Sequence, residues 1–160
     1  MTMQTLFEEL SAAHAAMTDY WYSKRNGSLL PSRRSLNPCD LRRYLSHLSI
    51  IELTGDDCSV RLSGTGVHRQ FGLRQKAYLR RDLRLIESNW WLQTALETAE
   101  RAAPSNGVRQ THDGDHVWLR LPFEEQGTAT PILVCHDYLI PSGSSSRARS
   151  SSSLQPSIAA

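Results

Sequence analysis

The stretch "VRQTHDGDHVWLRLPF", residues 108–123, decides the fold because it holds two strand-forming runs with a hairpin signal between them. The runs cover residues 108–112 and 116–124. Asp113-Gly114 lies between them, and this dipeptide is among the strongest short-range signals for a β-hairpin. A further apolar run, "TPILVCHDYLI" at 130–140, follows after a short turn segment. The C-terminal half therefore predicts three consecutive antiparallel strands.

A long helix precedes these strands, and another hairpin precedes the helix. The hairpin consists of "LSIIEL" at 48–53 and "CSVRLSG" at 58–64, with turn residues between them. The helix is predicted over 87–102, where the spacing of three and four separates two faces. One face carries Trp90, Trp91, Thr94, Ala95 and Thr98, and the other carries Glu97, Glu100 and Arg101.

The glycines of "RLSGTGVHRQFG", residues 61–72, resemble a nucleotide-binding loop only at first sight. A dinucleotide fingerprint that starts at Gly64 would need a further glycine where Arg69 stands, and no Gly-Lys-Ser/Thr follows Gly66 as a Walker A loop requires. We interpret the stretch as a short helix with Thr65 as its N-cap and Gly72 as its left-handed stop. In this interpretation the glycines allow the chain to turn and do not bind a nucleotide.

Residues 5–25 predict an amphipathic N-terminal helix, and a short second helix is expected over 37–45. The serine-rich end has no apolar periodicity and is expected to be disordered. The order of elements predicts an α+β fold, a five-stranded antiparallel sheet with helices on one face and an N-terminal helix. The expected units are 1–30 for packing or dimerisation, 31–141 for the sheet domain and 142–160 for the tail.

Composition and charge are those of one globular domain, with 39% hydrophobic residues and a net charge of +2. No run approaches the roughly 18 apolar residues of a membrane span, and acidic residues stand where a secretion signal would be basic. We therefore expect a cytoplasmic protein.

Basic residues dominate residues 69–84, but a solvated basic loop is favoured over a nucleic-acid site because base-stacking aromatics are not interleaved. Three widely spaced cysteines predict buried thiols, with neither a zinc knuckle nor a disulfide framework.

Motifs for catalysis are weak in this sequence. His112 and His116 flank the Asp113-Gly114 turn, and a metal would need a longer loop to bring the two histidines face to face. No nucleophile elbow is present, and Cys135 and His136 are strand neighbours that point to opposite faces. We expect neither a metal site nor enzymatic activity.

The aromatic residues are the better candidates for a binding site. Trp90 and Trp91 on the long helix and Trp118 on the fourth strand are expected near the interface of helix and sheet, where incomplete packing would leave a pocket. Plain core packing is the alternative. Arg120 alternates with leucines and is expected to face solvent or a partner, whereas a buried Arg120 would indicate an anionic ligand. Thr65 joins these four as a candidate ligand-binding residue.

Three segments together resemble a PAS domain. They are "YWYSKRNGSLLPSRRSLNPCDLRRYLSHLSIIEL" at 20–53, "VRLSGTGVHRQFG" at 60–72 and "HVWLRLPF" at 116–123. The ordered trio resembles the bacterial single-domain PAS family whose members begin with a Trp and Lys/Arg-Gly segment. The resemblance covers about residues 20–140 and implies a sensory or scaffold fold with a cavity between helices and sheet.

The resemblance implies a stand-alone sensory or regulatory module in bacterial signal transduction that binds a small ligand or a signalling protein. The alternative is a purely structural interaction domain with a self-filled core. A homodimer through the N-terminal helix is also implied, and membrane association is not. No cofactor is expected, because "FGLRQKAYL" lacks the cysteine of flavin photosensors and the long helix lacks the histidine of haem sensors.

Overall fold

The structure is a computed structural model and describes residues 1–79 and 88–144 of the chain. Its helices are α1 (Met3–Ser23), η1 (Arg33–Ser35), η2 (Arg42–His47), α2 (Thr65–Phe71), α4 (Ser88–Arg101) and η3 (Ser142–Ser144). Its strands are β1 (Leu48–Thr54), β2 (Asp57–Ser63), β3 (Ser105–Thr111), β4 (Gly114–Phe123) and β5 (Ile132–Pro141).

The five strands form one antiparallel sheet in the order β2-β1-β5-β4-β3. The two hairpins predicted from the ends of the domain join where β1 pairs with β5, for example at Ile50 and Val134. Because every neighbouring pair is antiparallel, the predicted α+β fold is confirmed.

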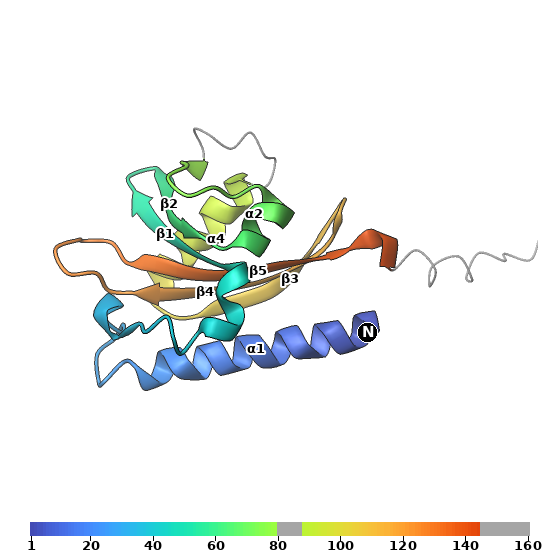
Figure 1. The fold of residues 1–160 in the computed structure, drawn as a ribbon. Helices are drawn as coiled ribbons and strands as arrows, with labels where there is room; N and C mark the ends of the chain where they lie inside the picture. The colour runs from blue at the N-terminus through green and yellow to red at the C-terminus, as the bar shows by residue number, and fades with distance from the viewer. Residues whose placement is uncertain (80–87, 145–160) are drawn as a thin grey trace, which may run out of the picture.

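Helices cover both faces of this sheet. In Figure 1, α2 and α4 lie on one side of the sheet and α1 crosses the other. Side chains alternate along β4, so that Val117 and Leu119 pack in clusters with α1 while Trp118 and Arg120 contact aromatic rings of α4. We call the α2 and α4 side the inner face and the α1 side the outer face.

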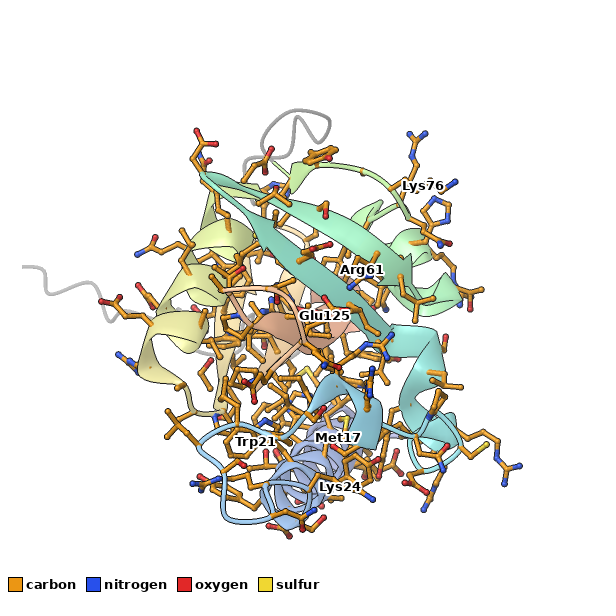
Figure 2. All side chains as sticks on the ribbon, turned by 90° about the vertical axis from the view of Figure 1, so that its left-hand side faces the viewer. Met17, Trp21, Lys24, Arg61, Lys76 and Glu125 are labelled. Atoms are coloured by element: carbon orange, nitrogen blue, oxygen red, sulfur yellow. The ribbon has the colours of Figure 1, made fainter. Side chains whose placement is uncertain are left out.

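α1 is fixed to the outer face by its apolar stripe. Met17 and Trp21 are almost fully buried, with exposures of 0% and 1%, in a cluster with Leu119 and Leu121. The indole nitrogen of Trp21 also donates a hydrogen bond to the Pro122 carbonyl oxygen at 2.6 Å. Figure 2, a view along α1, shows Met17 and Trp21 on the side of the helix toward the sheet. The same view shows Arg61 beside Glu125, whose carboxylate lies 2.7 Å from the guanidinium.

The β3–β4 turn differs from the sequence prediction by one residue. Thr111 pairs with Gly114, so His112 and Asp113 form the turn and Gly114 belongs to β4. The reason is the neighbouring strand, because a Cβ on Gly114 would overlap the carbonyl oxygen of Ile140. Glycine is therefore required here for close approach and for a φ of 145°.

The α2 segment confirms the structural role of its glycines and corrects its cap. Gly72 is left-handed with a φ of 69°, as predicted. The N-cap is Gly64 rather than Thr65, which is the first residue of the helix. A Cβ on Gly64 would overlap the backbone of Leu45 and Ser46, so the start of α2 lies directly on η2.

Further predictions are corrected in part or fall outside the described residues. The helix expected over 37–45 is a turn, in which Asn37 Oδ1 accepts a hydrogen bond from Cys39 N–H, followed by η2. Cys39 is exposed, whereas the other two thiols are buried as expected. Residues 80–84 of the basic segment and 145–160 of the tail predicted as disordered lie outside the described residues. No helix in the described part of the chain combines the length and the apolar character of a membrane span.

Candidate functional site

A charged triad lies at the centre of the inner face. His116 and Arg120 on β4 and Asp137 on β5 are all 0% exposed. Nε2 of His116 lies 2.6 Å from Oδ1 of Asp137, and Nη1 of Arg120 lies 2.9 Å from the same oxygen. Nη1 of Arg120 also donates to the Leu119 carbonyl oxygen at 2.9 Å. The triad exists because β4 and β5 are paired, which places Trp118 opposite Asp137 and puts His116 and Arg120 on either side of it.

The carboxyl group of Asp137 remains ionised in this position. Burial alone would raise its pKa, but the charge of Arg120 and the hydrogen bonds from His116 and Arg120 outweigh burial, so the pKa is lowered from its ordinary value. A buried ion pair with this many hydrogen bonds tolerates removal of either partner poorly, because the remaining charge would lie unpaired in an apolar core.

Aromatic rings surround the Arg120 guanidinium. Its Cζ lies 4.8 Å from the ring centre of Trp91, 5.4 Å from Trp118 and 5.7 Å from Trp90. Such distances are those of cation–π contacts, which stabilise a guanidinium that is removed from water. Phe71 of α2 completes the cluster, with ring centres 4.5 Å from His116 and 5.4 Å from Trp91.

Two arginines of this face retain nitrogens without hydrogen-bond acceptors. Nε and Nη2 of Arg120 and Nη1 of Arg109 are buried and have no hydrogen-bond partner within residues 1–79 and 88–144. The half-buried Trp90 ring contacts both guanidinium groups, and its centre lies 4.7 Å from Cζ of Arg109 and 5.7 Å from Cζ of Arg120. The arrangement therefore offers unused N–H donors of two cations that both contact one partly exposed ring.

The structure brings four of the five predicted site residues together. Trp90, Trp91, Trp118 and Arg120 form one cluster. Arg120 does not face solvent as expected, because the leucines beside it pack under α1 and both faces of the sheet are covered. Thr65 lies elsewhere, exposed in the first turn of α2 with its hydroxyl 3.4 Å from that of Ser46.

Sequence reasoning missed Asp137, Arg109 and the role of His116 in this site. Asp137 had a usable signal, because a carboxylate within the apolar run "ILVCHDYLI" needs a cation when the strand is buried. Arg109 gave no such signal, because a charged residue is ordinary in the mostly polar run "VRQTH". His116 was considered only with His112, yet His112 lies in the exposed turn whereas His116 pairs with Arg109 across the hairpin. Within residues 1–79 and 88–144, no group of three metal-ligating side chains is close enough to bind an ion.

Comparison with known proteins agrees with this architecture. A family model of a PAS domain matches residues 10–102, which is more than half of the chain. This chain belongs to the PAS domain family. The match runs from within α1 through α4, so it includes the helix on the outer face, the first hairpin and the helices of the inner face. A search of curated proteins found no match. As a PAS domain, the chain is a module of the sensory and regulatory kind.

Proposed function

We propose that this PAS domain is a regulatory module of bacterial signal transduction that binds a small anionic ligand on its inner face, between Arg120 and Arg109. It acts by binding and has no catalytic turnover. The observation that carries the proposal is the set of three buried guanidinium nitrogens, two on Arg120 and one on Arg109, that have no acceptor among the described residues. A carboxylate supplies the acceptor geometry that a guanidinium prefers.

The proposed ligand takes the place of the Trp90 ring. Trp90 is half-buried and contacts Arg109, His116 and Trp118 through ring or cation–π interactions. A carboxylate between the arginines would exchange a cation–π contact for charge-assisted hydrogen bonds, which are stronger. Because Trp90 belongs to α4, its displacement would favour a second arrangement of the helices, to the extent of the difference in ligand affinity.

A second candidate function has its own support. Phe71, Trp91 and His116 already fill the space beside Arg120 with ring contacts of 4.5–5.5 Å. A core that is filled by its own side chains suits an interaction domain that binds another protein without a small molecule. Met3 and Phe7, which are 40% and 38% exposed at adjacent turns of α1, would serve a signalling partner or a second copy.

The first experiment is native mass spectrometry of the protein purified from its own host. We expect one small anion per chain together with a dimer. Protein that carries no small molecule, and whose thermal unfolding is unchanged by acetate, succinate and citrate, would instead support the interaction domain.

A matched pair of variants tests the role of Arg120. Arg120→Met alone leaves Asp137 buried and unpaired, and we expect a loss of about 3–5 kcal/mol in the free energy of unfolding. Arg120→Met with Asp137→Asn removes both charges while the new amide oxygen still accepts from His116, so most of that loss should be recovered. The folded double variant should not bind the carboxylate that the native chain binds, as calorimetric titration measures. Unchanged affinity would exclude Arg120 as the ligand-binding cation.

A further inference from the structure

A groove separates α1 from η2 on the outer face of the sheet, opposite the Arg120 cluster. Its volume is about 580 Å³, within the roughly 300–1,000 Å³ of small-molecule sites. Tyr44, His47, His136 and Tyr138 line its polar side, and Leu10 and Ala13 line its apolar side. The groove therefore has the size and the mixed lining of a ligand site.

His136 presents an unpaired nitrogen in this groove. The residue is 4% exposed, and its Nδ1 lies 2.9 Å from Nε2 of the buried His14. This hydrogen bond fixes the plane of the ring. Among the described residues, none forms a hydrogen bond with Nε2 of His136. Nε2 is not among the buried side-chain atoms that lack a partner, so this nitrogen is accessible from the groove, where a bound molecule can hydrogen-bond to it.

The groove has little net charge near neutral pH. Burial, followed by the proximity of His14, lowers the pKa of His136 to about 3, and burial lowers the pKa of His47 as well. The lining also carries one cation and one carboxylate, Arg43 and Glu9. Neutral imidazoles and balanced charges favour an uncharged ligand over an ion.

The rings that line the groove define the shape of the ligand. His47 and Tyr138 lie 4.6 Å apart between ring centres, and Tyr44 stands perpendicular to His136 at 6.2 Å. The His47 ring is held in place because it packs against Gly66 of α2, where a Cβ would leave it no space. Pre-positioned aromatic walls favour a flat aromatic molecule, which gains stacking without ordering new side chains.

We propose that the groove between α1 and η2 is a second ligand site, which takes a planar aromatic molecule carrying a hydroxyl group that hydrogen-bonds to Nε2 of His136. A hydroxyl fits either tautomer of the His14–His136 pair, because it can donate to a bare nitrogen or accept from an N–H. The ligand would touch both α1 and β5, so its binding would strengthen the contact of α1 with the sheet.

The test compares 2-naphthol with 2-methoxynaphthalene as probes of the native chain at pH 7.5. We expect 2-naphthol to bind at least about tenfold more tightly than 2-methoxynaphthalene. The methyl ether cannot donate a hydrogen bond to the imidazole, and its methyl group hinders approach of the ether oxygen to the ring nitrogen. Amide chemical-shift changes on titration should centre on α1, η2 and β5. Equal affinity for the two probes, or shifts centred on other elements, would overturn the proposal.

Two variants locate the binding further. Ala13→Met fills the groove and should weaken 2-naphthol binding at least about tenfold, whereas the matched change Ala16→Met on the exposed face of α1 should leave it unchanged. His136→Phe keeps a ring but removes the nitrogen, and if it folds it should remove the preference for the hydroxyl. Full 2-naphthol affinity in Ala13→Met would also overturn the proposal.

The two proposed sites are tested independently. Because succinate is directed to the inner face, it should not compete with 2-naphthol, and loss of support for one site leaves the evidence for the other unchanged.

Discussion

Nε2 of His14 and Nδ1 of His136 lie 2.9 Å apart in the interior, so that one buried hydrogen bond joins the first helix of the chain to its last strand. Only one proton fits between the two nitrogens, and protonation of both rings would place two N–H groups against each other. The hydrogen bond between α1 and β5 therefore requires that at least one of the two histidines be neutral.

Acid should loosen this contact before it affects the Asp137 triad. Burial, more than any neighbouring charge, lowers the pKa of His14 to about 4 from the 6.5 expected in the unfolded chain, and the pKa of His136 is lowered as well. The unfolded chain then binds more protons between pH 6.5 and 4, so the stabilisation present above pH 6.5 is lost as the pH falls. Asp137 has a pKa below 3.8, and its contribution is lost only at lower pH.

We expect His14 alone to lower the free energy of unfolding by on the order of 3 kcal/mol between pH 7 and pH 4, with a further loss from His136, as measured by urea denaturation. The control is His14→Gln, in which a neutral amide replaces the shared imidazole and the pH dependence over this range should become shallower. An equally steep dependence in His14→Gln would show that other groups control acid stability.

α1 should contribute to the stability of the sheet domain rather than fold as a separate unit. Met17→Ala removes a fully buried side chain at the α1–sheet contact and should lower the free energy of unfolding by about 2–5 kcal/mol. Met3→Ala, on the exposed side of the same helix, should change it by less than about 0.5 kcal/mol. Urea titrations followed by helix and tryptophan signals should coincide. If Met17→Ala melted the helix alone, α1 would be independent of the sheet.

Gly64→Ala should destabilise the chain through a backbone collision. The φ of Gly64 is −67°, which alanine adopts freely, but the new Cβ would overlap the carbonyl oxygens of Leu45 and Ser46. Relief requires η2 to move away from α2, and we expect a loss above about 2 kcal/mol in thermal or urea unfolding. Gly143→Ala is the control, because no atom lies within 4 Å of its Cβ position. A loss below 0.5 kcal/mol in Gly64→Ala, roughly that of an ordinary surface change, would show that the junction is loose.

Local sequence signals gave most of the fold. Both hairpins, α4 and the stop at Gly72 were predictable, because turn residues and apolar periodicity act over a few positions. The errors occurred where a neighbour in space intervened. The turn moved to His112 and Asp113 because β5 approaches Gly114, and the α2 cap moved to Gly64 because η2 lies against it.

In the candidate site, too, the sequence prediction was wrong where a distant part of the chain intervened. The tryptophans were predictable as large aromatics at the helix–sheet interface, whereas the orientation of Arg120 was not. Alternation along β4 correctly separates Arg120 from the leucines, but it does not say that both sides are buried. Burial of both sides depends on α1, because α1 covers the leucines on the outer face while Arg120 pairs with Asp137 on the inner face.

The sequence by itself determined the order of the main elements and the two hairpins, since these follow from contacts between residues near one another along the chain. The tertiary structure alone decided which partners meet across long separations, namely Arg120 with Asp137 and His14 with His136. The physical reason is that burial of a charge or an imidazole is tolerated only when its partner arrives from another element, and the position of that element is set by packing of the whole core.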